Sequence, residues 1–365
     1  MGETASGTRT WPSVASLRPA SGRRPELDGL RGIAVLLVVI GHMTYGVSPH
    51  EPKAFLPGFP GLFHGGGITG VQLFFVLSGY LITIILVAGI SDRGARSFGN
   101  FYARRAARLL PALIMVCAVY AVFVAVAREG SEQALGFKSV LSALTYTSNL
   151  PLITSDYWLG HTWTLAVEEQ FYLAWPVGLL IALRVGGTRA ALAMALAIIA
   201  ATVAVRHTPL MSPTTMPALR WDALLVGAVI ALVPLKGSWM IGALGVAVLA
   251  YYSFFVSLAP DVYLVTAIAA AAVIVSARDH QWLANPVLQF FGLISYGLYL
   301  WHVLVMRFGW PGPVSLLVSV VVATASYLFV ELRFLRWHAS RREEARLAEP
   351  APTGAGRPVA ASAER

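Results

Sequence analysis

Apolar runs of membrane-spanning length recur along nearly the whole chain, and no other feature constrains the fold as strongly. Hydrophobic residues make up 57% of the 365 residues and charged residues only 12%, whereas a soluble globular protein carries about 25% charged residues. Because about 20 apolar residues span a bilayer, the sequence predicts an all-α integral membrane protein rather than a soluble protein with an oversized core. We expect ten transmembrane helices, at about 30–48, 69–90, 109–127, 163–183, 189–205, 219–234, 239–257, 262–277, 287–306 and 313–332.

One further run, 136–153, contains a lysine, an asparagine and a proline. It predicts an interfacial or re-entrant helix rather than a full span. We place the transmembrane domain at 26–338, between a disordered tail over 1–25 and a mostly disordered tail over 339–365. Both tails are rich in small, polar or charged residues and in proline, which disfavour a packed core.

The basic residues between the runs indicate an orientation. Most of them fall in loops on one side of the predicted bundle, and cytoplasmic loops carry the excess of Lys and Arg. We therefore expect a multi-pass protein of the inner or plasma membrane with both termini in the cytoplasm. The net charge is +9, but the cations sit in short clusters between apolar runs, so we expect no nucleic-acid partner. Cys117 is the only cysteine, and we expect no metal and no bound cofactor.

The first apolar run carries two ionisable side chains, Arg31 and His42. Eleven residues separate them, so on a helix they point from nearly the same face, about 16 Å apart along the axis. One interpretation is structural: Arg31 extends to lipid headgroups and His42 makes a hydrogen bond within the bundle. The alternative is catalytic, because ionisable groups at depth are costly and usually line a site, and neutral histidine accepts protons near pH 7.

The stretch HTWTLAVEEQFYLAWP, residues 161–176, places two adjacent glutamates inside an apolar run. His161 and Glu168 are seven residues apart and share a helix face within about 20°, whereas Glu169 points about 100° away. We therefore expect Glu168 to share a polar cavity with His161 and Glu169 to brace a neighbouring helix. A buried carboxylate pair held by arginine or tryptophan for structural reasons is the alternative.

The stretch FYARRAARLLPAL, residues 101–113, forms a basic cluster of Arg104, Arg105 and Arg108 at one helical end. Plain anchoring at the cytoplasmic face explains it as well as a phosphate clamp does. The clamp is plausible because guanidinium groups match phosphate oxygens in pairs.

Other polar residues in apolar runs are weaker signals, more often structural than catalytic when each is taken alone. Ser78-Gly79 indicates close packing or a kink. The candidates for an acceptor site or for structural roles are His161, Trp163, Glu169, Arg220, Asp222 and His302.

In their order along the chain, these stretches resemble the membrane-bound acyltransferase-3 family, multi-pass proteins that acylate surface glycans, lipids or antibiotic sugars. Arg31-x10-His42 resembles the family's Arg/Lys-x10-His motif, and Arg105-x-x-Arg108 resembles its Arg-x-x-Arg motif. Residues 161–176 resemble its Trp-Ser-Leu-x-x-Glu-Glu-Gln-Phe-Tyr signature, with threonine in place of serine. The resemblance covers residues 26 to about 336. The family's late Glu-x-Pro motif is Glu-Leu-Arg here, so the glutamate at 331 carries no weight.

The resemblance implies an O-acyltransferase that moves an acyl group, by default acetyl, from acyl-CoA to a sugar hydroxyl of a surface glycan, a glycolipid or an antibiotic. His42 would accept the hydroxyl proton or carry the acyl group transiently, and Glu168 would orient or charge-balance the site. Arg31 and the basic cluster would hold the donor, which arrives from the cytoplasm. A glycolipid or polysaccharide transporter without acyl transfer is the alternative.

Overall fold

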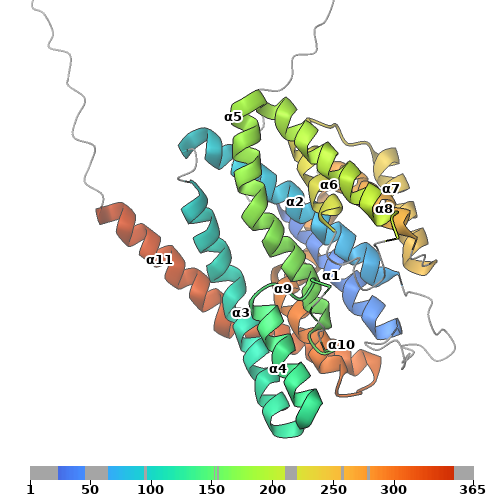
Figure 1. Ribbon diagram of the computed structural model, residues 1–365, viewed down its shortest axis with the longest axis vertical. Helices are drawn as coiled ribbons and strands as arrows, with labels where there is room; N and C mark the ends of the chain where they lie inside the picture. Colours follow the sequence, from blue (N-terminus) through green and yellow to red (C-terminus); the bar gives the residue numbers. More distant parts are fainter. Residues whose placement is uncertain are drawn as a thin grey trace, which may run out of the picture.

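The computed structural model describes residues 24–45, 65–93, 97–151, 153, 156–209, 220–255, 259–277 and 280–348. Every regular element in these ranges is helical, which confirms the predicted all-α class (Figure 1). Most of the predicted N-terminal tail and the chain from 349 onward lie outside the described residues. The long helices are α1 (Pro25–Tyr45), α2 (Gly66–Arg93), α3 (Ser97–Ala127), α4 (Gly130–Leu144), α5 (Trp163–Arg206), α6 (Trp221–Leu232), α7 (Trp239–Phe254), α8 (Pro260–Ala277), α9 (Pro286–Met306), α10 (Gly312–Ser326) and α11 (Leu332–Ala348), with short turns η3 (Gly160–Thr162), η5 (Gln281–Ala284) and the π-helical η6 (Tyr327–Glu331).

Helices α1, α2, α6 and α9 form the centre of the bundle: α1 packs against α2 and α9, and α2 packs against α6. Glycines let the backbones approach. A Cβ on Gly79 would lie 1.8 Å from Leu224 O, and a Cβ on Gly292 would lie 2.0 Å from Asp28 O. Small residues at helix contacts are the usual device where lipid removes the hydrophobic drive to association. Because α2 is unbroken at Gly79, that glycine serves close packing rather than a kink.

Helix α5 consists of two halves. Its backbone leaves helical geometry at Gly186 and Gly187, and Gly187 has a φ of 62°, a value that favours glycine. Figure 1 shows the two halves forming a V, and a Cβ on Gly178 would lie 3.4 Å from the Met194 side chain of the other half. The prediction of two separate helices at 163–183 and 189–205 is thereby confirmed.

Six helical segments in the described part of the chain are long and apolar enough to cross a membrane: Gly66–Ser91, Phe98–Ala127, Gly160–Arg206, Pro260–Ala277, Pro286–Met306 and Gly312–His338. The apolar helices α6 and α7 have 12 and 16 residues. At a rise of about 1.5 Å per residue, both helices are shorter than the hydrocarbon core of a bilayer, which is roughly 30 Å thick. The same holds for the 15-residue α4, which overlaps the run predicted to be interfacial or re-entrant. The count of ten spans and the cytoplasmic termini stay predictions.

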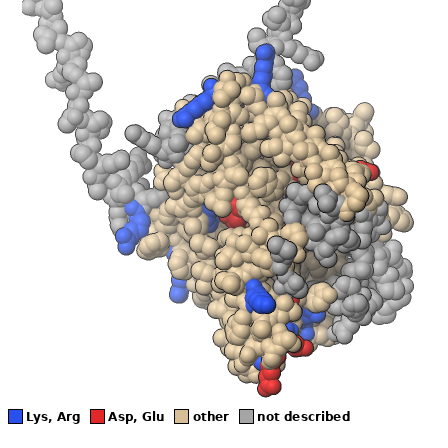
Figure 2. Space-filling model, viewed as in Figure 1, with Lys and Arg blue, Asp and Glu red and all other residues tan. Residues whose placement is uncertain are grey.

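The outer surface of the helices is largely apolar. Few charged side chains interrupt the tan face in Figure 2. Exposed apolar side chains include Val122 on α3, Leu173 and Ile181 on α5 and Leu317 on α10, as expected for surfaces in contact with lipid tails. At the end of the bundle, α10 continues through a π-helical turn into α11, which reaches Ala348, past the predicted domain end at 338.

The glycine contacts generate a stability prediction. Gly227→Ala places a Cβ 2.1 Å from Val76 O, which is backbone and cannot move aside. We expect the melting temperature in detergent to fall, since overpacking a tight contact costs about 1–3 kcal/mol or more.

Gly99→Ala is the matched control, because no atom lies within 4 Å of a Cβ on this α3 glycine. Its melting temperature should stay unchanged or rise slightly, since alanine is favoured over glycine within helices by about 0.5–1 kcal/mol. Equal melting temperatures for the two variants would contradict the packing argument.

Candidate active site

A cavity of about 610 Å³ opens among α1, α2, α3, α5 and α9. Its volume lies in the range of small-molecule sites. The charged residues that line it are Arg24, Asp28, Arg31, Arg104, Arg105, Arg108 and Glu168. The structure thus brings together every arginine predicted to hold the donor and one of the two glutamates.

Arg105 is the most firmly held of these arginines. Its Nη2 atom lies 2.7 Å from Glu169 Oε1. The centre of its guanidinium lies 3.4 Å from the centroid of the Tyr172 ring, a cation–π contact. Glu169 on α5 therefore braces α3, the neighbouring-helix contact expected from its place on the helix, and it does not line the cavity.

The other arginines differ in their surroundings. Arg31 Nη1 lies 3.0 Å from Asp28 Oδ1, one turn earlier on α1. Arg104 is exposed and its Nε donates to Asn100 O at 3.2 Å. Arg108 is half-buried and makes no hydrogen bond or ion pair within the described residues. Its guanidinium is therefore the one most available to an anionic ligand in the cavity.

Glu168 meets polar groups of α2 and α5. Tyr172 OH donates to Ser78 Oγ at 2.7 Å, and Ser78 lies beside Glu168 in the cavity wall. Ser78 therefore contributes a hydroxyl to a polar patch of the cavity, next to the tight α2–α6 contact.

The expectation that Glu168 shares this cavity with His161 is wrong. His161 is not among the lining residues. It lies in the short turn η3 rather than on α5 itself, and its Nε2 atom is 3.3 Å from Leu300 O. The turn rotates His161 away from the face that the seven-residue spacing assigned to it, because that spacing assumes an uninterrupted α-helix.

Three histidines from three segments meet beyond the cavity. His302 Nε2 lies 3.3 Å from His42 Nδ1, and the ring centroids of His302 and His161 lie 5.4 Å apart. His161 and His302 are buried, whereas His42 is partly exposed. His42 is therefore the histidine of this cluster that a substrate can approach.

Tyr299 joins the cavity to the histidine cluster. Its hydroxyl donates to His161 O at 2.7 Å and lies 2.7 Å from Thr164 Oγ1, and both Tyr299 and Thr164 line the cavity. Its backbone oxygen lies 2.7 Å from His302 Nδ1. The cavity wall and the histidines are thus one hydrogen-bonded unit.

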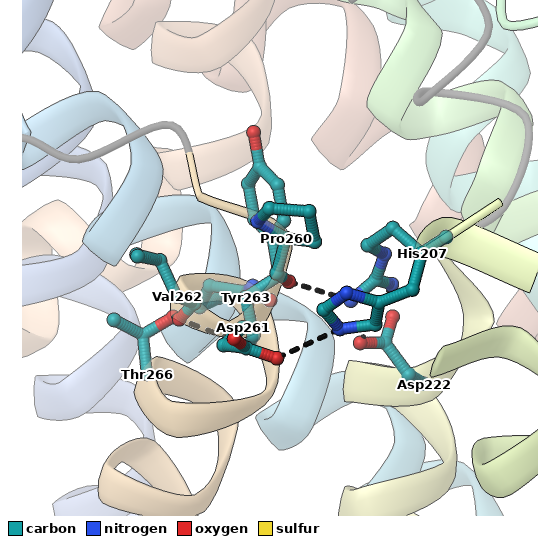
Figure 3. A network of polar contacts seen from close by, with 9 residues as sticks. His207, Asp222, Pro260, Asp261, Val262, Tyr263 and Thr266 are labelled. Atoms are coloured by element: carbon teal, nitrogen blue, oxygen red, sulfur yellow. Dashed lines mark hydrogen bonds and ion pairs between the residues drawn. The ribbon is translucent and has the colours of Figure 1, made fainter. Parts of the chain in front are cut away.

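Arg220, Asp222 and Trp163 lie in a second buried polar group. Arg206 Nη2 lies 2.8 Å from Asp222 Oδ2, with both side chains almost wholly buried. Figure 3 shows Asp222 beside the start of α8. The centre of the Arg220 guanidinium lies 3.8 Å from the Tyr263 ring centroid and 5.5 Å from that of Trp163. None of these residues lines the cavity.

Comparison with known proteins identifies the family to which the chain belongs. Residues 24–330 match a family described as an acyltransferase domain. The chain belongs to the membrane acyltransferase-3 family.

Individual relatives of this acyltransferase family carry names that refer to O-acetylation. "Putative peptidoglycan O-acetyltransferase YrhL" of Bacillus subtilis is 30% identical over 360 residues, which cover 84% of this chain and 54% of the relative. "Peptidoglycan O-acetyltransferase OatA" of Listeria monocytogenes is 34% identical over 173 residues, which cover 44% of this chain and 25% of the relative. The chain spans about half the length of the first of these relatives. No solved structure shows a significant match to the chain.

The match identifies a multi-pass membrane protein with an acyltransferase domain, which favours an enzyme over the transporter alternative. Sequence reasoning missed one residue of the cavity wall, Tyr299, and one residue of the second polar group, Arg206. Tyr299 precedes His302 by three residues, a spacing that places both on one helical face and could have revealed the pair. Arg206 follows the predicted helix at 189–205, and only the fold shows that it pairs with Asp222.

The Arg206–Asp222 pair generates a second stability prediction. Asp222→Asn leaves a buried guanidinium without its carboxylate, and breaking a buried pair costs about 3–5 kcal/mol. We expect a clear drop in melting temperature in detergent.

Asp261→Asn is the control, because Asp261 pairs with His207 at 2.9 Å in a largely exposed position close by (Figure 3). Exposed pairs contribute little, so this variant should melt like the wild type. An unchanged melting temperature for Asp222→Asn would show that the buried pair is not needed for stability.

Proposed function

We propose that the chain is an O-acetyltransferase that moves an acetyl group from acetyl-CoA to a hydroxyl of a cell-wall glycan. The observation that carries the proposal is the cavity in which Arg31, Arg105, Arg108 and Glu168 converge. The cavity begins at the end of α1 that carries Arg31, and His42 follows eleven residues later on the same helix. The names of the relatives support acetyl as the acyl group and peptidoglycan as the acceptor.

The charge of the cavity supports a phosphate-bearing donor. Arginines outnumber carboxylates in its wall, and a wall of one charge sign concentrates ligands of the opposite sign. Arg108 supplies a guanidinium that makes no hydrogen bond or ion pair within the described residues, and Arg105 supplies one whose direction Glu169 and Tyr172 fix. Guanidinium groups bind phosphate oxygens in pairs, so the phosphates of coenzyme A would lie near α3.

The chemistry would take place at His42. The imidazole takes the proton of the acceptor hydroxyl while the hydroxyl oxygen attacks the carbonyl carbon of the thioester. The C–S bond breaks, the thiolate leaves, and the proton passes from His42 to the sulfur. A transient acyl group on His42 is the two-step form of the same transfer. Glu168 would orient the donor within the cavity.

A donor from the cytoplasm would also set the orientation of the bundle in the membrane. The donor is made in the cytoplasm, so the end of the bundle with Arg31 and the basic cluster would face the cytoplasm, together with both termini. His42, near the other end of α1, would then meet an acceptor from the opposite face of the plasma membrane.

The central test is His42→Gln in purified protein reconstituted in liposomes. Release of free CoA from acetyl-CoA is measured with a chito-oligosaccharide or a muramic-acid-containing fragment as acceptor. We expect the rate to fall at least about 100-fold, since a general base contributes 10²–10⁴-fold. The melting temperature should stay within a few degrees of the wild type. A folded variant that keeps more than about a tenth of the wild-type rate would remove His42 from the mechanism.

A second prediction concerns the donor. Arg108→Gln should raise the KM for acetyl-CoA about 10-fold or more and leave the KM for the acceptor unchanged, because only the donor carries the phosphates. Arg108→Lys should recover part of the loss, since a point charge replaces the planar fork. Arg184→Gln, which removes an exposed arginine of α5 outside the cavity, serves as the control. Equal increases in both KM values for Arg108→Gln would contradict a donor-binding role.

A further inference from the structure

The positions of the ring nitrogens of His302 determine where its proton lies. Nδ1 lies 2.7 Å from Tyr299 O and 3.1 Å from Leu298 O. A carbonyl oxygen can only accept a hydrogen bond, so Nδ1 must carry the hydrogen. His302 is fully buried, and no carboxylate is among its contacts in the described part of the chain, so the ring is neutral. Its Nε2 atom is therefore a hydrogen-bond acceptor.

One ring nitrogen of His42, Nδ1, lies close to two hydrogen-bond acceptors. Its Nδ1 atom lies 3.0 Å from Val38 O and 3.3 Å from His302 Nε2. Since neither of these atoms has a hydrogen to give, His42 Nδ1 must carry one. In the neutral ring the lone pair then lies on Nε2.

We infer that His302 is a positioning residue that holds His42 in the Nδ1-protonated tautomer and so makes Nε2 of His42 the reactive atom. The inference rests on the proposed function, in which His42 takes a proton or an acyl group. When Nε2 becomes protonated or acylated, the ring is cationic and the Nδ1–H···Nε2 bond to His302 becomes charge-assisted, which strengthens it. The acceptor from α9 thus stabilises the charged state of His42 that transfer creates.

Val38 O accepts from the same Nδ1 atom of His42. It lies one turn before His42 on α1, and as the i−4 carbonyl it is available to any histidine at this helical position. His302 comes from a different helix and fixes the plane of the His42 ring as well, with 5.0 Å between the ring centroids. His161 has another role: its Nε2 contacts Leu300 O, and its ring packs against His302 without a hydrogen bond to His42.

Two amide variants of His302 separate positioning from packing. In His302→Gln the side-chain amide reaches the place of Nε2, so its oxygen can still accept from His42 Nδ1–H. In His302→Asn the shorter amide stays near the place of Nδ1, where it can donate to Tyr299 O but does not reach His42. The two variants have the same polarity and the same amide group.

The kinetic measurement uses the full chain in liposomes, with acetyl-CoA and a chito-oligosaccharide. We expect His302→Gln to keep kcat within about fivefold of the wild type. His302→Asn should lower kcat at least 10-fold at unchanged KM for both substrates, because the side chain of His302 is fully buried. Nuclear magnetic resonance of protein labelled with 15N-histidine should show a protonated Nδ1 on His42 in the wild type and in the Gln variant, and mixed tautomers in the Asn variant.

Three outcomes would overturn the inference. They are a wild-type kcat for folded His302→Asn, equally low kcat values for the two folded amide variants, and an Nδ1-protonated His42 in the Asn variant. The proposed function fails separately: if folded His42→Gln is active, His42 is not the reactive group whatever His302 does. If His42→Gln is inactive and His302→Asn has the wild-type kcat, only the positioning role is lost. Should either amide variant fail to fold, the 15N spectrum of the wild type still decides which nitrogen of His42 is protonated.

Discussion

The close contact between α1 and α9 determines where the catalytic candidates lie. A Cβ on Gly32 would lie 2.2 Å from Leu288 O and 3.1 Å from Gly292 N, so the two backbones touch at this point. His42 and His302 each follow ten residues later on their helices, a rise of about 15 Å in both. The histidines meet because the two helices leave the glycine contact in the same direction and advance equally. A side chain at the glycine contact would separate the helices and, with them, the two rings.

Ion pairs hold several charged side chains of the bundle. Arg105 pairs with Glu169, Arg206 with Asp222 and Arg31 with Asp28. An unpaired charge within a membrane protein is expensive and usually functional. Among the described cavity residues, Arg108 has neither an ion pair nor a hydrogen bond and Glu168 has no ion pair. These two groups therefore carry the strongest structural argument for a ligand in the cavity.

Local features of the site could be predicted from the sequence, because they depend on helical periodicity. The angle between Glu168 and Glu169 on α5 separates a cavity residue from a brace, and the glycine pair at 186 and 187 divides α5 into two helices between the two predicted ranges. The same periodicity failed for His161, because a 3-10 turn precedes α5. The contact of His42 with His302 joins residues 260 positions apart. A single sequence contains no information on the register of two distant helices, so this contact could not be predicted.

Tyr299 shows how the donor side and the histidines can act as one site although His42 does not line the cavity. Its side chain lies in the cavity wall, and its hydroxyl is fixed between Thr164 and the backbone of His161. Its carbonyl accepts the hydrogen of His302, which in turn accepts from His42. The orientation of His42 therefore depends on one turn of α9 that also forms the cavity wall. Under the proposed function, in which donor and acceptor approach from opposite membrane faces, such a shared turn would keep Nε2 of His42 aligned with the cavity while the two substrates remain apart.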